Sequence, residues 1–173
     1  MQKNIPTTDL CDAYLREGGA GFRVLAPVFR HFGGRTAFYG PVRTVQCFED
    51  NALVKAALDE PGWVDTPGGR VAQVLVVDGG ASLRRALVGG NIGQLAARNG
   101  WAGVVIDGCV RDVSELELCD VGICALAAMP MPTVKRQTGL RDVPVHIQGV
   151  PVAPGEWLYA DRDGIVVAPQ ALA

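Results

Sequence analysis

Several residue types that carry specific chemistry are scarce in this chain. Its 173 residues include two histidines and three lysines, and its five cysteines form an odd set with no CxxC pair. Neither a disulfide framework nor a zinc site is therefore indicated. We expect the cysteines to be buried thiols in a reducing compartment; they are Cys11, Cys47, Cys109, Cys119 and Cys124.

Long apolar runs are also missing. No stretch approaches about 18 consecutive apolar residues, the length that a membrane-spanning helix needs. The segment from Met1 to Pro6 lacks the apolar core of a signal peptide. The sequence thus predicts no membrane span and a cytoplasmic protein.

Charge of one sign is not in excess. The chain has 16 basic and 18 acidic residues, for a formal net charge of −2. Because a phosphate backbone is bound by clustered positive charge, this balance argues against nucleic acid as a direct partner.

The few histidines and lysines limit the catalytic mechanisms that the chain can use. His31 and His146 have no Ser or Asp pattern around them, so a catalytic triad is not indicated. A Schiff-base lyase needs a desolvated lysine. However, Lys3 is terminal, Lys55 belongs to an amphipathic segment and Lys135 belongs to a predicted loop. If the chain cleaves carbon–carbon bonds, a divalent metal is the expected electron sink.

Glycine, in contrast, is abundant. The 22 glycines are about twice the usual share and predict many tight turns. A chain of this length suits one domain, and no repeat or low-complexity tract divides it. We therefore expect a single domain over residues 1–173.

Apolar periodicity predicts a layered α/β architecture with a β-rich C-terminal part. The predicted helices are Thr7–Arg16, Asn51–Leu58, Leu83–Val88, Ile92–Arg98 and Asp112–Leu118. The predicted strands are Val42–Phe48, Val71–Val77, Gly103–Ile106, Val143–Ile147, Val150–Val152, Trp157–Tyr159 and Ile165–Val167. Phe29–Tyr39 and Pro61–Arg70 are predicted to be connections.

The most informative stretch runs from Val104 to Asp112, where a buried strand places Arg111 and Asp112 just past its carboxyl end. Ligand sites of α/β sheets favour that position. Arg111 offers a planar fork for a carboxylate, and Asp112 offers hard oxygen ligands for Mg²⁺ or Mn²⁺. Spacing alone leaves a structural alternative, in which Asp112 and Glu115 cap a helix and Arg111 is a surface charge.

A second candidate element is a pair of glycines ahead of a helix. Gly89 and Gly90 precede Asn91 and Ile92, and such a start leaves backbone N–H groups free to bind an anion. A substrate carboxylate could dock there. The alternative is a glycine break between two helices.

Two further motifs are predicted to be simple turns. Asp78 to Gly80 lacks the spacing of a nucleotide-binding loop. Asp161 to Gly164 lacks the glycine position and the glutamate of a calcium loop.

Seven segments taken together resemble the RraA-like family of class II aldolases. They are Leu10–Asp12, Phe32–Arg35, Gly40–Val42, Cys47–Asn51, Val74–Gly80, Gly108–Asp112 and Tyr159–Ile165. The resemblance covers nearly the whole chain. The family includes regulators of ribonuclease activity and 4-hydroxy-4-methyl-2-oxoglutarate aldolases that also decarboxylate oxaloacetate. Older naming called some members menaquinone methyltransferases, but this chain has no glycine-rich nucleotide fingerprint to support methyl transfer.

The resemblance implies a swivelling β/β/α fold and a homotrimer, sometimes doubled to a hexamer, with sites between neighbouring chains. It also implies roles for residues. Arg111 would bind the carboxylate and keto oxygen of a 2-oxo acid, and Asp112 would hold the divalent metal. The backbone amides of Gly89 to Ile92 would contact the substrate.

One position departs from the family pattern. Aldolases of the family usually carry an aspartate that is separated from the Arg-Asp pair by twenty residues and orients a catalytic water. This chain has Gly90 there, followed by Asn91, whose amide is a poor proton acceptor.

Two functions of different classes follow. As an enzyme, the chain would break a carbon–carbon bond of a 2-oxo acid and release pyruvate, with Arg111 and the metal stabilising the enolate. The intact pair of Arg111 and Asp112 favours this function. As a non-catalytic regulator, it would bind a ribonuclease of the RNase E type and slow RNA turnover, which the departure at Gly90 favours. Metal-dependent release of pyruvate from oxaloacetate distinguishes the two.

Overall fold

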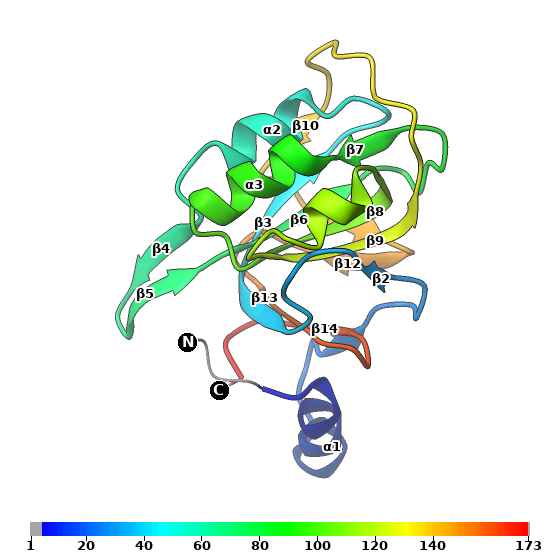
Figure 1. The fold of residues 1–173 in the computed structure, drawn as a ribbon. Coiled ribbons are helices and arrows are strands. Elements are labelled where there is room, and N and C mark those ends of the chain that lie inside the picture. The colour runs from blue at the N-terminus through cyan, green and yellow to red at the C-terminus, as the bar shows by residue number, and fades with distance from the viewer. Residues whose placement is uncertain (1–4, 173) are drawn as a thin grey trace.

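A curled mixed sheet forms the centre of the molecule, and helices cover one of its faces (Figure 1). The computed structural model describes residues 5–172. The elements are α1 (Thr7–Glu17), β1 (Arg23–Val24), β2 (Arg30–His31), β3 (Phe38–Gln46), α2 (Ala52–Leu58), β4 (Trp63–Thr66), β5 (Gly69–Ala72), β6 (Val74–Asp78), β7 (Ala86–Val88), α3 (Gly90–Arg98), β8 (Gly103–Val110), α4 (Val113–Leu116), β9 (Gly122–Ala128), β10 (Leu140–Arg141), β11 (Val145–Ile147), β12 (Val150–Val152), β13 (Trp157–Ala160) and β14 (Ile165–Ala168).

The main sheet follows the order β1-β14-β13-β3-β6-β8-β9-β2, with β10 beside β3 and β7 beside β8. Strands β3, β6, β8 and β9 are parallel to one another, and β13 and β14 extend the sheet in antiparallel fashion. The hairpins β4-β5 and β11-β12 lie outside it. Parallel strands place their carboxyl ends at one edge of the sheet, and the predicted site residues follow two of them.

The central strands are buried on both faces, which explains their unbroken apolar sequences. On one face, Val77 and Ile106 pack into a core with α2, α3 and α4. On the other face, Val76 and Val105 pack into a second core with the C-terminal strands. This α/β architecture with a β-rich C-terminal part confirms the predicted fold class.

The predicted helix Leu83–Val88 is wrong. Residues Ala86–Val88 form strand β7, which pairs in parallel with Cys109 and Val110 of β8 and is fully buried. The sequence of a short apolar run shows no periodicity that distinguishes a buried strand from a buried helix. Pairing with β8 determines that these residues form a strand.

Other boundaries also differ from the prediction. The predicted connection Pro61–Arg70 contains strand β4 and the start of β5, which form an exposed hairpin. The predicted strand Val71–Val77 is divided at Gln73 between β5 and β6. Strand β9, which was not predicted, pairs with β8 and with β2. Among residues 5–172, no helix is long and apolar enough to cross a membrane.

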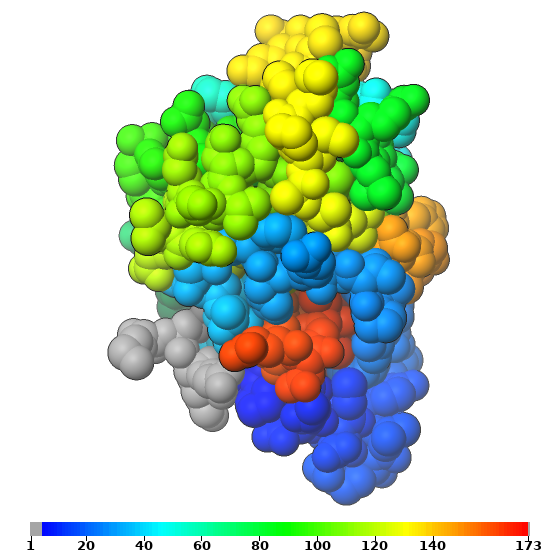
Figure 2. All heavy atoms as spheres, turned by 45° about the vertical axis from the view of Figure 1, so that its right-hand side comes forward, coloured from blue at the N-terminus to red at the C-terminus, as the bar shows by residue number. Residues whose placement is uncertain are grey.

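Helix α1 lies at one end of the molecule, next to the C-terminal segment (Figures 1 and 2). Its first residue is held by the turn between β13 and β14. The Asp161 carboxylate accepts hydrogen bonds from the Thr7 backbone N–H and the Thr7 hydroxyl, each at 2.7 Å. It also accepts one from the Asp163 N–H at 2.9 Å. Asp161 thus serves as a long-range cap for a helix whose preceding residue, Pro6, makes no side-chain cap.

The hydrogen bonds to Asp161 outweigh its burial, which alone would raise the carboxyl pKa, and they leave that pKa below its ordinary value. Replacing Asp161 with Asn puts an amide donor against the Thr7 donors. We expect Asp161→Asn to lower the free energy of unfolding at pH 7 by about 1–3 kcal/mol. Urea denaturation measures this change.

The same substitution has a pH signature. Because the folded-state pKa is lowered, the contribution of Asp161 is complete above the ordinary carboxyl pKa of about 4 and is lost as the pH falls through the folded value. The difference in stability between wild type and Asp161→Asn should therefore shrink below about pH 4. A difference that stays constant from pH 7 to pH 3 would contradict this role for Asp161.

Candidate functional site

The candidate site lies where strands β7 and β8 end. The two strands are parallel neighbours, so Gly89, which follows β7, comes next to Arg111, which follows β8. The Arg111 backbone N–H donates to the Val88 carbonyl at 2.9 Å and extends the pairing to this point. The two elements predicted separately from the sequence thus meet at one edge of the sheet.

Glycine at position 89 leaves room for the Arg-Asp pair, which packs directly against its Cα. A Cβ on residue 89 would lie 2.6 Å from Asp112 Oδ2 and 3.2 Å from Arg111 Cγ. The φ angle of Gly89 is −127°, so a side chain there would meet crowding and not backbone strain, and the Asp112 carboxylate would have to move. The close approach fixes where the Arg111 and Asp112 side chains leave the backbone.

Asp112 adopts a left-handed conformation, with φ 57° and ψ 46°, which is uncommon for a residue other than glycine. Its side chain makes no capping hydrogen bond to α4. Instead, Asp112 Oδ2 accepts a hydrogen bond from the Gly90 N–H at 3.0 Å and lies 3.8 Å from Arg111 Nε. The alternative in which Asp112 caps its own helix is therefore wrong.

A pocket of about 170 Å³ opens at this point. Of the residues predicted for the site, its wall contains Gly89, Asn91, Ile92, Arg111 and Asp112. The rest of the wall comes from the start of α2, the first residue of β7 and the segment after β9, and consists of Asn51, Lys55, Ala86, Pro132, Thr133 and Lys135. The volume suits a molecule smaller than most drugs, whose pockets measure about 300–1,000 Å³.

Helix α3 begins at the pocket. The first N–H groups of any α-helix have no partner within the helix, and the helix dipole adds positive potential there. Of these groups, the Gly90 N–H is already bonded to Asp112, and Gly90 itself does not line the pocket. Asn91 and Ile92 are the helix residues that present this end to a ligand.

Glu115 lies against Gly90 in the structure, a contact that the sequence did not predict. A Cβ built on Gly90 would collide with the Glu115 carboxylate. Glu115 therefore occupies the space beside residue 90 in which a longer side chain at that position would lie. It belongs to the wall of a neighbouring hollow that also contains Gln94 and Arg98, and not to the wall of the 170 Å³ pocket. Its spacing of three residues from Asp112 was the available signal, and it was interpreted as capping.

Two buried polar residues, Asp50 and Asn51, fasten the segment after β9 to the start of α2. Asp50 Oδ2 accepts hydrogen bonds from the backbone N–H groups of Arg136 and Thr138 at 2.8 and 3.1 Å, while Oδ1 accepts from Ala52 at 3.0 Å. The pKa of Asp50 is lowered, because these hydrogen bonds outweigh the effect of its burial.

Asn51 completes this attachment. Its Oδ1 accepts the Thr133 hydroxyl at 2.8 Å, and its Nδ2 donates to the Leu87 carbonyl at 3.0 Å. From the sequence, Asn51 was predicted to begin a helix, and both Asp50 and Asn51 belong to the family segment Cys47–Asn51. In Figure 2 the fastened segment (yellow, near residue 130) forms the outer surface at the top of the molecule.

Two lysines belong to the pocket wall. Lys55 and Lys135 were predicted only to lie on an amphipathic segment and in a loop, without a desolvated environment; in the structure both line the pocket with Arg111. Both are exposed, whereas a Schiff-base lysine needs a desolvated environment. Lys3 lies outside the described residues.

The residues present fit one class of metal. Within residues 5–172 there is no group of three or more His, Cys, Asp or Glu side chains that could enclose an ion, so a structural zinc site does not fit. Mg²⁺ is commonly held by one or two carboxylates and keeps several waters. Asp112, whose Oδ1 accepts no hydrogen bond from the described residues and whose side chain is 41% exposed, suits that mode.

The other candidates have structural roles. The His31 ring bonds to the Asp161 carbonyl at 2.7 Å and lies 3.5 Å from the Cys124 thiol, whose pKa burial raises to about 12. Asp78 accepts a hydrogen bond from the Gly80 N–H at 3.0 Å within a turn. All five cysteines are free, and only Cys11 is not fully buried.

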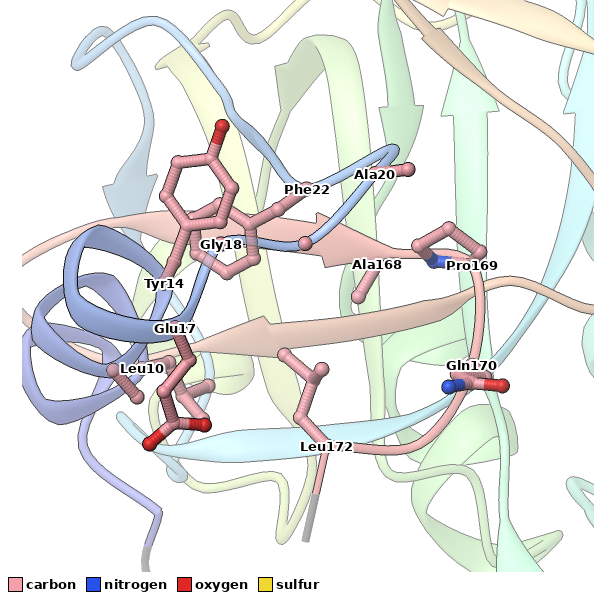
Figure 3. Close-up of a pocket in the computed structure, with 12 residues that line it drawn as sticks. Leu10, Tyr14, Glu17, Gly18, Ala20, Phe22, Ala168, Pro169, Gln170 and Leu172 are labelled. Carbon is pink, nitrogen blue, oxygen red and sulfur yellow. The ribbon is translucent and has the colours of Figure 1, made fainter.

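A larger hollow of about 560 Å³, which shares no residue with the 170 Å³ pocket, lies between α1 and the C-terminal segment (Figure 3). Tyr14 and Phe22 stack on one side of it, with their ring centroids 4.6 Å apart. Leu10, Pro169 and Leu172 are among the other residues of its wall. Its lining is mostly apolar and contains no residue of the predicted site, so it is not the candidate for an oxo acid.

A pocket at the carboxyl ends of central parallel strands, lined by a few convergent polar groups, is typical of an α/β protein that binds a small molecule. A sequence model of the RraA-like family, described as Aldolase/RraA, matches residues 7–167. The chain therefore belongs to the RraA-like family, as its motifs predicted.

Individual relatives agree with this assignment. A protein of Albidiferax ferrireducens, provisionally named 4-hydroxy-4-methyl-2-oxoglutarate aldolase, is 63% identical over 97% of both chains. The solved structure of the RNA-processing inhibitor RraA from Thermus thermophilis has a TM-score of 0.88 and 46% identity, and the match covers 99% of this chain and 96% of that one. A structure from Geobacillus kaustophilus, titled S-adenosylmethionine:2-dimethylmenaquinone methyltransferase, has a TM-score of 0.85 and 41% identity over 97% of each chain.

The crowding at Gly89 yields a prediction. We expect Gly89→Ala to displace the Asp112 carboxylate and to weaken Mn²⁺ binding about tenfold or more, since 1.4 kcal/mol of lost interaction has that effect. The melting temperature should change little, because the displaced side chains are half-exposed. Titration calorimetry with Mn²⁺ measures the affinity. Gly164→Ala is the matched control, because a Cβ there meets nothing within 4 Å; equal Mn²⁺ affinity in both variants would refute the role of Gly89.

Proposed function

We propose that this chain is a divalent-metal-dependent lyase that cleaves 4-hydroxy-4-methyl-2-oxoglutarate, and decarboxylates oxaloacetate, to release pyruvate. The observation that carries the proposal is the packing of Arg111 and Asp112 against Gly89 at the wall of a small pocket. The name of the relative from Albidiferax ferrireducens, at 63% identity, supports it.

Arg111 would bind the substrate's 1-carboxylate and 2-oxo oxygen. Its nearest acid is Asp112, and the two approach only to 3.8 Å through Nε, so the terminal nitrogens remain available for a bidentate contact. The same guanidinium would stabilise the negative charge that develops on the 2-oxo oxygen as the bond breaks. The N–H groups at the start of α3 would add further donors for the carboxylate.

Asp112 would hold Mg²⁺ or Mn²⁺ through its carboxylate. When bound, the ion supplies the Lewis acidity that polarises the 2-oxo group. The Gly90 N–H, bonded to Asp112 Oδ2 at 3.0 Å, keeps this carboxylate oriented. The left-handed backbone of Asp112 is consistent with a functional position, since such conformations cluster at active sites.

Glu115 would supply the carboxylate that the departure at Gly90 removes. Its carboxylate lies against Gly90, in the space that an aspartate at residue 90 would need. We infer that Glu115 exchanges a proton with the substrate through a water molecule. The absence of a side chain at Gly90 would then leave the room that the Glu115 carboxylate needs, so the change to glycine would not remove the catalytic carboxylate.

The test of the function is release of pyruvate from oxaloacetate with and without Mg²⁺. We expect release above the uncatalysed rate in the presence of Mg²⁺ and its abolition by a chelator. Because Lys55 and Lys135 line the pocket, borohydride reduction in the presence of pyruvate is an essential control. A trapped lysine adduct, or release that survives the chelator, would overturn the metal mechanism.

Arg111→Lys conserves charge but loses the planar fork. We expect kcat/KM to fall by about 10²-fold, roughly 2.7 kcal/mol of transition-state stabilisation. Steady-state kinetics with oxaloacetate measures the change. Wild-type kinetics in this variant would remove Arg111 from the site.

Glu115→Gln should lower kcat by about 10²-fold while Mn²⁺ affinity is retained, because the amide cannot accept the proton. Gly90→Asp in the Glu115→Gln background should then recover part of kcat, and Gly90→Ala in that background should recover none. In wild type, Gly90→Asp should not help, because the two carboxylates compete for one space. A Glu115→Gln protein with unchanged kcat would show that the reaction does not use this group.

The likeness to the RNA-processing inhibitor, at 46% identity, supports a second candidate, a non-catalytic protein that inhibits a ribonuclease of the RNase E type. Inhibition of a ribonuclease would not require the residues of the pocket. Ribonuclease inhibition that persists in Arg111→Lys, together with absent pyruvate release in wild type, would favour the regulator.

We also propose that the chain forms a homotrimer or hexamer, as the family resemblance implies. The exposed hairpin β4-β5 and the short edge strands β1 and β2 offer surfaces that neighbouring subunits could cover. Light scattering that returns the 18.3 kDa of a single chain would contradict this assembly.

A further inference from the structure

The pocket contains more positive charge than the proposed pyruvate half of a substrate requires. Lys55, Arg111 and Lys135 line it, and Asp112 is its only acidic residue. Residues 50–51 and 132–135 bring the two lysines together from α2 and from the segment after β9, which are far apart in the sequence. Among the described residues of the pocket wall, three cationic side chains therefore stand against one carboxylate.

The lysines differ from the paired arginines elsewhere in the molecule. Six arginines lie within 3.1 Å of a carboxylate oxygen; they are Arg23, Arg35, Arg43, Arg70, Arg84 and Arg141. In the part of the chain that the structure describes, neither Lys55 nor Lys135 has an ion-pair partner. The carboxylate of Asp50 is buried and bonded to backbone N–H groups, and among the described residues it forms no ion pair with either lysine.

The positions of the two lysines are built into the fold. Lys55 lies one helical turn after Asn51 on α2, and residues i and i+4 share a face of a helix. Lys135 lies between two fastened neighbours, because Thr133 bonds to Asn51 and the Arg136 N–H bonds to Asp50. The backbone that carries each lysine is therefore fixed relative to the other, although the side chains themselves are exposed.

We propose that Lys55 and Lys135 form a second anion subsite, which binds the distal carboxylate of the substrate and makes the pocket selective for 2-oxo acids with two carboxylates. The proposal rests on the proposed function, in which Arg111 binds the other end of the same molecule. Lysine supplies charge without a fixed bidentate geometry. That property suits a carboxylate that belongs to the departing half of the substrate and must move away once the carbon–carbon bond is broken.

The test compares two ligands that share the 2-oxo acid head. Pyruvate has one carboxylate, and 2-oxoglutarate has two. Because 2-oxoglutarate lacks a 4-hydroxyl group and a carboxylate next to C3, the proposed enzyme can neither cleave nor decarboxylate it. Calorimetric titration in the presence of Mg²⁺ measures both affinities without any turnover. Wild type should bind 2-oxoglutarate at least tenfold more tightly than pyruvate, and the preference should weaken as salt is added.

Substitution then identifies the subsite. Lys55→Met and Lys135→Met should each lower the affinity for 2-oxoglutarate about tenfold, within the range for hydrogen bonds to charged groups, and should leave the affinity for pyruvate within twofold. The control is Arg16→Gln, which removes one exposed positive charge from α1 and should change neither affinity. Circular dichroism of each variant verifies that it is folded.

The outcomes separate this subsite from the lyase proposal. Loss of the 2-oxoglutarate preference in the lysine variants supports the subsite even if wild type releases no pyruvate from oxaloacetate, in which case only the lyase function fails. Pyruvate release with a preference that the double variant Lys55→Met/Lys135→Met retains would overturn the subsite and leave the lyase intact. Absence of binding by either ligand, or an equal loss of both, would also overturn the subsite.

Discussion

The contact between the ends of β7 and β8 is the constraint on which the site depends. Gly89 leaves room for the side chains of Arg111 and Asp112, and the Asp112 carboxylate accepts the Gly90 N–H at the start of α3. One glycine and one hydrogen bond thereby bring a guanidinium, a carboxylate and a helix N-terminus to a single small pocket. A side chain at residue 89 would separate these groups, and a side chain at residue 90 would displace Glu115.

Charged side chains on the surface and charged side chains in the pocket are paired differently. On the surface, six of the arginines form close pairs with carboxylates, such as Arg43 with Glu60 at 2.7 Å, and exposed pairs of this kind contribute little to stability. In the pocket, three cationic side chains face one acidic side chain. A net charge of −2 for the whole chain hides this local excess, so composition argued against nucleic acid as a direct partner but could not indicate an anion site.

The sequence predicted the parts of the fold that depend on local signals. The buried runs of β6 and β8 were found because parallel strands covered on both faces are continuously apolar, and Arg111 and Asp112 were found because they follow such a strand. Residues Leu83–Val88 were predicted wrongly because pairing with β8, and not their own period, makes part of them a strand. Lys55, Lys135 and Glu115 were missed for the same reason, since only the folded chain brings them to the pocket or to Gly90.

The central claim is that the Arg-Asp pair at the end of β8 binds the metal and the oxo acid together. Anomalous diffraction from a crystal soaked with Mn²⁺ and pyruvate tests this most directly, because manganese can be located by its own scattering. The account predicts a manganese peak within about 2–2.5 Å of an Asp112 carboxylate oxygen, with the pyruvate carboxylate on Arg111. A manganese peak at another carboxylate, such as Asp161, with pyruvate absent from Arg111, would contradict it.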